Sequence, residues 1–324
     1  MTVRPHRFRF TCALIGVIAL ICVVGLAVAQ TPADPELSRG GGDPDASFVF
    51  QKRVDEVNLL FTVVDHRGRF ISNLQLNDFE ILDDRRAPEK IHSFQQESDL
   101  PLRVALVVDI SGSVTPRFKY EQQAAIDFFK KILRPAVDRA MVVGFNEKVQ
   151  LEQDLTNDVG VLRNAVLHLK PEGETALYDA IVYAAERLQK QSEKGTRKVI
   201  ILISDGENNH SHAIMNDAQQ AALRAEAPIY ALSTNIQHEG DYSKGEAIMD
   251  LLSRYTGGEI LPAREKENVV WAFRQVEQAL RSQYVLSYKP ADFSTDGRYR
   301  EVKLSARKPK LKVESRHGYY APRE

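Results

Sequence analysis

The fold of this chain is decided by residues 100–114, which read LPLRVALVVDISGSV. The apolar run at 104–108 is short and uninterrupted, which predicts a buried strand. After it, apolar strands alternate with amphipathic helices as far as residue 288, the pattern of βαβ units around a parallel sheet. We therefore predict an α/β fold: an open, mostly parallel, Rossmann-like sheet with helices on both faces, flanked by small β segments.

The alternation after residue 100 predicts the elements of this domain. Strands are expected at 104–108, 141–145, 199–204, 229–233 and 284–288. Helices are expected at 116–133, 159–169, 177–191, 215–225, 247–255 and 268–281. Thr115 is a candidate N-cap of the first helix, because Pro116 suits the first helical position.

Residues 1–29 have the pattern of a secretory signal peptide. Three arginines precede an apolar run at 12–28, and Ala27 and Ala29 have the small side chains that a signal peptidase requires. The alternative is an uncleaved membrane anchor, since the apolar run approaches the length that spans a bilayer. In either case the rest of the chain is predicted to be exported, to the periplasm, the cell surface or the medium.

Cysteine and charge content argue against several classes of function. Both cysteines, Cys12 and Cys22, lie within the signal segment, so cleavage after Ala29 would leave no thiol for a disulfide, a thiolate enzyme or a cysteine metal site. The 43 basic and 44 acidic residues include three arginines in that segment, so the mature chain has a formal charge of −4. That balance argues against nucleic acid as a main partner.

Composition and pattern divide the remaining chain into four parts. Residues 30–47, rich in Pro, Gly and Asp, predict a flexible linker. Short β-type runs predict a small β unit at 48–98, and the α/β domain follows at 100–288. The last segment, 289–324, alternates again. We predict that it is β structure and pairs with 48–98, so that the α/β domain is inserted between the two.

The candidate functional residues begin directly after the first buried strand. Asp109, Ser111 and Ser113 alternate in the sequence there. In an extended or turning segment, side chains at this spacing converge on one side. They would place one carboxylate and two hydroxyls at the carboxyl end of the sheet, where open α/β folds bind their ligands.

A second carboxylate and a third hydroxyl are expected at the same edge. The apolar strand KVIILIS ends in Asp205 and would lie beside the first strand. Thr175 stands in a loop before a helix, where its hydroxyl can reach a neighbour or cap the helix. Hard oxygen ligands of this kind suit Mg²⁺, with Mn²⁺ or Ca²⁺ as alternatives. Because hydroxyl ligands are neutral, such a metal keeps a position for an outside anion.

Together these residues resemble the von Willebrand factor A (VWFA) domain and its metal-ion-dependent adhesion site (MIDAS), written Asp-x-Ser-x-Ser with a distant Thr and a distant Asp. The matching metal positions are Asp109, Ser111, Ser113, Thr175 and Asp205. The resemblance implies that the first three form one ligand loop, that Thr175 is a direct or near ligand, and that Asp205 acts through water. The flanks DFEILDDRRAPEKIHSF and RHGYYAP resemble bacterial VWFA-related proteins first recognised in acidobacterial genomes.

The resemblance predicts an exported adhesion module without enzyme activity, in which an acidic side chain of a protein partner completes the metal's shell. A scaffold in an envelope complex, with a purely stabilising metal, is the alternative. A phosphoester hydrolase is disfavoured, because an aspartyl-phosphate enzyme needs a second Asp where Ser111 stands. The sequence also lacks the GxSxG, Walker A and HExxH motifs. His210 and His212 are assigned to a solvated loop.

Overall fold

The computed structural model describes residues 56–96, 100–115, 118–193, 195–235 and 243–323. The signal segment and the linker predicted at 1–47 lie outside these residues. Residues Arg53–Glu324 form one compact unit. Among the described residues, no helix is long and apolar enough to cross a membrane.

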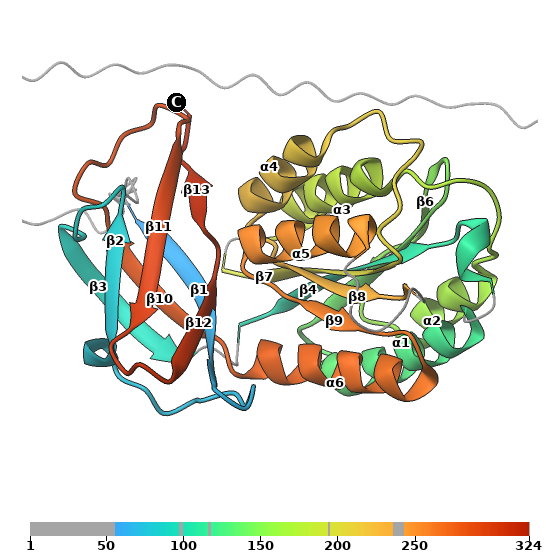
Figure 1. The fold of residues 1–324 in the computed structure, drawn as a ribbon, viewed down its shortest axis with the longest axis horizontal. Helices are drawn as coiled ribbons and strands as arrows, with labels where there is room; N and C mark the ends of the chain where they lie inside the picture. Colours follow the sequence, from blue (N-terminus) through green and yellow to red (C-terminus); the bar gives the residue numbers. More distant parts are fainter. Residues whose placement is uncertain (1–55, 97–99, 116–117, 194, 236–242, 324) are drawn as a thin grey trace, which may run out of the picture. The chain divides into compact units, whose positions relative to one another are not determined.

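A six-stranded, mostly parallel sheet forms the centre of the α/β domain, which confirms the predicted fold class (Figure 1). Its strands are β4 (Leu102–Asp109), β5 (Arg139–Phe145), β6 (Val149–Thr156), β7 (Arg197–Ser204), β8 (Ile229–Ser233) and β9 (Ile260–Pro262). They lie in the order β6-β5-β4-β7-β8-β9, and the edge strand β6 runs antiparallel to β5. Every residue of β4 is buried, as expected for a strand covered on both faces.

In the described part of the chain, three helices cover each face of this sheet. The helices α1 (Phe118–Ile132), α2 (Val159–His168) and α6 (Lys266–Arg281) share one core with the sheet, and α3 (Leu177–Gln191), α4 (Met215–Ala225) and α5 (Lys244–Thr256) share the other. Successive residues of β4 alternate between the cores, with Val104 and Leu106 in the first and Ala105 and Val107 in the second.

Local signals explain where some of these helices begin and end. Asp158 caps α2 by accepting hydrogen bonds from the backbone N–H groups of Gly160 and Val161. Ser243 and Glu246 form a capping box at the start of α5. Thr115, predicted to cap α1, instead donates its hydroxyl hydrogen to the carbonyl oxygen of Gly112, 2.9 Å away. It therefore closes the preceding turn, and Pro116 lies outside the described residues.

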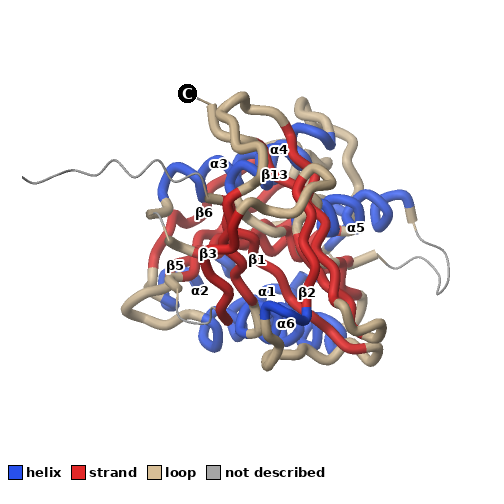
Figure 2. Tube along the Cα trace, turned by 90° about the vertical axis from the view of Figure 1, so that its left-hand side faces the viewer, coloured by secondary structure: helices blue, strands red, loops and turns tan. Residues whose placement is uncertain are grey.

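Strands from the two ends of the described chain form a separate β unit, which faces the viewer in Figure 2. Its strands are β1 (Val57–Asp65), β2 (Phe79–Asp83), β3 (Lys90–Gln96), β10 (Tyr284–Lys289), β11 (Tyr299–Ala306), β12 (Leu311–Ser315) and β13 (Gly318–Tyr320). One sheet has the order β12-β1-β10-β3 and the other the order β13-β11-β2. The C-terminal strands β12 and β11 thus pair with the N-terminal strands β1 and β2.

The strand predicted at 284–288 forms, but it is not part of the parallel sheet. As β10, it pairs antiparallel with β1 and β3 in the β unit. The reason lies in its two tyrosines: the ring of Tyr284 stacks on Phe61 and Phe94, and the hydroxyl of Tyr288 donates to Asp83 of β2. These partners are contributed only by the β unit.

Three further strands have no counterpart among the predicted elements. The edge strand β6 carries the polar sequence VQLEQDLT and is only partly buried, so its apolar signal is weak. The strands β9 and β13 are three residues each, which is too short for a periodicity to show.

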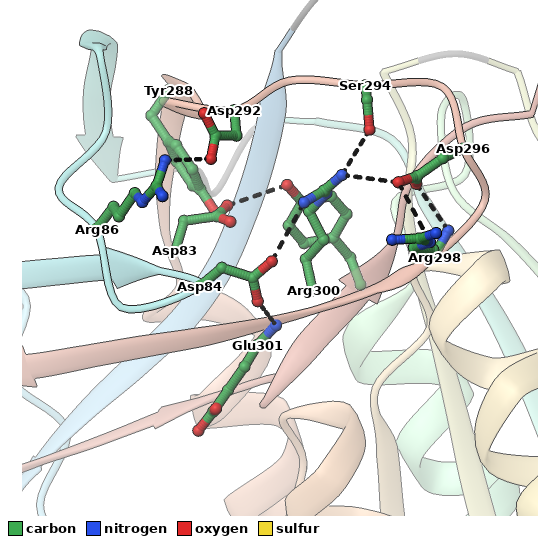
Figure 3. A network of polar contacts seen from close by, with 11 residues as sticks. Asp83, Asp84, Arg86, Tyr288, Asp292, Ser294, Asp296, Arg298, Arg300 and Glu301 are labelled. Atoms are coloured by element: carbon green, nitrogen blue, oxygen red, sulfur yellow. Dashed lines mark hydrogen bonds and ion pairs between the residues drawn. The ribbon is translucent and has the colours of Figure 1, made fainter.

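A network of polar contacts joins the β2–β3 turn to the C-terminal segment (Figure 3). Asp84 and Arg85 occupy the left-handed region, with φ of 44° and 66°, which forms a tight two-residue turn. The carboxylate of Asp84 accepts hydrogen bonds from the backbone N–H of Glu301 and from the guanidinium of Arg300. Because the turn binds β11 in this way, the last part of the chain is tied to the first part of the β unit.

Candidate metal centre

Asp109 is the most deeply buried residue of the site. It ends β4 and is fully buried. Its Oδ1 accepts a hydrogen bond from the backbone N–H of Ser111 (2.9 Å), and its Oδ2 accepts one from the hydroxyl of Ser204 (2.7 Å). Burial raises the pKa of Asp109 to about 6; the nearby charge of Asp205 adds to the rise, and hydrogen bonds from Ser111 and Ser204 oppose it.

Two hydroxyls and the second carboxylate converge beside Asp109. The Oγ atoms of Ser111 and Ser113 lie 3.1 Å apart. The hydroxyl of Ser113 donates to Oδ2 of Asp205 at 2.8 Å, which joins the loops that follow β4 and β7. Ser111 and Asp205 are buried, whereas Ser113 is exposed. The cluster is therefore open to solvent on the side of Ser113.

Thr175 lies in an adjoining loop that is fastened to both of the others. The backbone N–H of Gly112 donates to the carbonyl oxygen of Gly173 (3.1 Å), which ties the Thr175 loop to the Asp109 loop. The N–H of Thr175 donates to Oδ1 of Asn209, and its carbonyl oxygen accepts from the N–H of Asn209. The structure thus joins Asp109, Ser111, Ser113 and Asp205 through their polar groups, and connects Thr175 to them by its backbone.

The loop that carries Asp205 requires glycine at the next position, Gly206. Gly206 has a φ of +81°, and a Cβ there would lie 2.4 Å from the carbonyl oxygen of Gly245 in the first turn of α5. A Cβ on Gly245 would in turn lie 2.5 Å from the carbonyl oxygen of Asp205. The loop and α5 are in backbone contact, so no larger side chain fits between them.

Sequence reasoning missed the residues that orient the site. Ser204 holds Asp109 and also accepts a hydrogen bond from the N–H of Gly206. Asn208 and Asn209 accept hydrogen bonds from the N–H groups of Leu177 and Thr175 and so fix the loop before α3. Only the nearness of these residues to Asp205 in the sequence could have indicated them.

The donor set fits a hard divalent cation. It offers three hydroxyls and two carboxylates, and oxygen ligands are those that Mg²⁺ and Ca²⁺ prefer. His210 and His212 do not join it; their Nδ1 atoms lie 3.5 Å and 3.2 Å from carboxylate oxygens of Glu174 and Asp179. Within the described part of the chain, no group of three or more His, Cys, Asp or Glu residues is placed to hold a metal. A metal here would thus depend on the serine and threonine hydroxyls.

The order of these loops along the chain agrees with a known domain family. Residues 104–207 match the von Willebrand factor type A domain. The matched range of this type A domain contains all five predicted metal positions. The likeness to the acidobacterial-type subfamily stays a prediction. A comparison with curated proteins finds no significant match.

Several solved structures resemble the chain at low identity. The PilB minor pilin from Streptococcus sanguinis is 13% identical, with a TM-score of 0.47, over 56% of this chain and 62% of that chain. The vWF domain of the type V pili tip protein Mfa5 from Porphyromonas gingivalis is 16% identical, with a TM-score of 0.46, over 55% of this chain and 94% of that one.

The third structure is proximal thread matrix protein 1 from the mussel byssus, with a zinc-occupied MIDAS motif. It is 17% identical, with a TM-score of 0.49, over 62% of this chain and 50% of that chain. The chain therefore spans less than two thirds of the length of the pilin and of the byssus protein.

Proposed function

We propose that this chain is an exported, metal-dependent protein-binding module. A divalent cation, Mg²⁺ with Mn²⁺ or Ca²⁺ as alternatives, would be held by Asp109, Ser111, Ser113, Thr175 and Asp205. An acidic side chain of a protein partner would complete its shell. The observation that carries the proposal is the convergence of the Ser111 and Ser113 hydroxyls on the Asp205 carboxylate beside buried Asp109. Export rests on the N-terminal sequence pattern alone.

The charges of the site explain why the partner should be acidic. Three of the five ligands are neutral hydroxyls, so a bound divalent cation receives anionic donation only from Asp109 and Asp205 and stays electrophilic toward one further anionic ligand. The exposed side of the cluster is at Ser113, so an outside group approaches there. A carboxylate is the hard anionic oxygen donor that a protein partner can offer at such a position.

The hydrogen bonds between the loops favour binding over the scaffold alternative. The bonds from Gly112 to Gly173 and from Thr175 to Asn209 join the three loops through protein atoms alone. A metal is then not needed as a brace, which leaves recognition as its main role. The absence of enzyme activity stays a prediction of the sequence.

Direct metal binding is the first test of this function. We expect the purified mature chain to bind Mg²⁺ in calorimetry and the Asp109→Ala variant to lose that binding. Asp158→Ala, which removes only a helix cap, is the matched control and should retain it. Binding that survives in Asp109→Ala would refute the site.

The second test is capture of partners by the immobilised chain with Mg²⁺, with EDTA and with Asp109→Ala. A partner lost under both of the last two conditions, and also lost when its own acidic residues are changed to amides, supports metal-bridged recognition. Partners that are indifferent to all three changes would instead support the scaffold.

A further inference from the structure

A large cleft lies away from the metal centre, at the junction of the β unit and the α/β domain. Its volume is about 1110 Å³. Its lining comes from α6, from the turn after β1 (residues 66–69), from the start of β12 and from Glu259, which precedes β9. The metal centre is at the carboxyl end of β4 and β7, whereas Glu259 is at the amino end of β9. The cleft is therefore a separate site.

One stripe of α6 faces this cleft and takes no part in the core. Trp271, Gln275 and Gln278 of α6, and its C-cap Ser282, all line the cleft and are spaced so that they lie on one side of the helix. The opposite side of the helix packs into the sheet through residues such as Phe273 and Val276. Trp271 is 42% exposed, which is unusual for the largest apolar side chain. Burial against a ligand would remove this exposed indole surface from water.

The charged groups of the cleft leave a small positive excess. Four guanidinium or ammonium groups and three carboxyls line it. Arg69 pairs with Asp65 at 2.7 Å and Lys312 pairs with Glu314 at 2.5 Å. Burial, together with the charge of Glu314, raises the pKa of Glu259 to about 7. Two of the four cations are thus neutralised by pairing, and the small positive excess disfavours a cationic ligand. An anionic ligand is the competing outcome, which the titration below distinguishes.

The uncharged polar groups of the cleft suit a ligand that carries many hydroxyl groups. The amides of Gln275 and Gln278 both donate and accept hydrogen bonds, as a hydroxyl does. Most lining residues carry polar side chains, so the cleft lacks the apolar pockets that anchor a typical protein partner. An aromatic face with a few placed polar groups is a combination that orients a small ligand.

We propose that this cleft binds an uncharged saccharide chain, with the Trp271 indole packed on the C–H face of a sugar ring and Gln275, Gln278 and Glu259 hydrogen-bonded to its hydroxyls. This function is additional to metal-dependent recognition and does not depend on it. A type A domain that binds a protein partner at one end would thereby be attached to a glycan at the other.

Tryptophan fluorescence tests the proposal directly, because Trp271 is the only tryptophan in the chain. The full mature chain is titrated with chitohexaose, cellohexaose and maltohexaose at up to millimolar concentration. We expect a saturable blue shift of the emission with at least one of these neutral oligosaccharides, unchanged by EDTA. No shift with any of them, or a shift only with acidic oligosaccharides or peptides, overturns the proposal.

Two variants within the stripe and one control outside it show whether the stripe itself is responsible. Gln275→Ala should lower the affinity for the oligosaccharide by about fivefold to tenfold, as the loss of one or two hydrogen bonds predicts. Gln150→Ala removes an exposed glutamine on β6, outside the cleft, and should leave the affinity unchanged. Trp271→Ala should abolish binding in calorimetry while the unfolding temperature shows the chain still folded. Equal affinity in Gln275→Ala, Gln150→Ala and the unchanged chain would refute the site.

Discussion

Asp109 is ionisable and fully buried, so its state depends on the few groups that touch it. Burial raises its pKa, and the hydrogen bonds from the Ser111 N–H and the Ser204 hydroxyl favour the charged form. Ser204 also accepts from the N–H of Gly206, so one hydroxyl orients a carboxylate of β4 and the loop of Asp205 together. Residues that orient a ligand in this way affect metal affinity without touching the metal.

We therefore predict that Ser204→Ala weakens Mg²⁺ binding by roughly tenfold to a hundredfold. The reason is that Asp109 loses the donor on Oδ2 and the N–H of Gly206 loses its acceptor. Calorimetric titration measures the change. Ser253→Ala is the control, since Ser253 is equally buried but its hydroxyl has no hydrogen-bond partner among the described residues. Equal Mg²⁺ affinity in both variants would contradict the role of Ser204.

Gly206→Ala should both destabilise the protein and weaken metal binding. The new Cβ would lie 2.4 Å from the backbone of Gly245, and the alanine would also have to adopt a positive φ. Gly68→Ala isolates the second effect, because Gly68 has a φ of +72° with nothing within 4 Å of the new Cβ. Urea unfolding should show a loss of about 1 kcal/mol for Gly68→Ala and at least about 1 kcal/mol more for Gly206→Ala. Similar losses would mean that the close approach to α5 is unimportant.

At the scale of elements, β9 and β12 bring two carboxyls together at the edge of the cleft. Glu259 precedes β9, and Glu314 and Lys312 belong to β12. Burial and the charge of Glu314 raise the pKa of Glu259 to about 7, and Lys312 opposes the rise. The folded protein thus holds a proton on Glu259 at a pH where the unfolded chain has released it. The stability due to this proton is complete below about pH 4.5 and is lost as the pH rises through 7.

Glu259→Gln should remove this pH dependence. We expect the variant to equal the unchanged protein near pH 4 and to be more stable by up to about 3 kcal/mol near pH 8, where the half-buried carboxylate of Glu259 is charged. Chemical unfolding at the two pH values measures the difference. Glu301→Gln changes an exposed side chain on β11 and should show no such gain. A variant that gains equally at both pH values would show that burial of the charge is not the cause.

At the scale of the whole molecule, the β unit is assembled from both ends of the described chain. The strands β1, β2 and β3 come before the α/β domain, and β10 to β13 come after it. The two sets share one core, in which Leu59 and Phe61 pack with residues such as Tyr288 and Val302. The α/β domain is inserted into this unit, so the β unit is completed only when the C-terminal strands are present.

An engineered disulfide can test this arrangement, because the predicted mature chain has no cysteine of its own. Val64 and Lys312 are directly opposite in the β1–β12 pair, so cysteines at both positions should oxidise to a cross-link. A pair at Val64 and Val313 is the control, since Val313 is one position out of register and faces the other side of the sheet. Non-reducing electrophoresis reads the result; cross-linking of the control pair alone would refute the register.

The sequence alone determined the fold class and most of the helices and strands, because hydrophobic periodicity is a local property. It also gave five candidate metal positions, which stay a prediction, since each follows or precedes a recognisable strand or helix. Only the tertiary structure decided that β10 belongs to the β unit, because its tyrosines find their partners in β1, β2 and β3. The same holds for Ser204 and the cleft at Trp271, which depend on contacts between segments far apart in the chain.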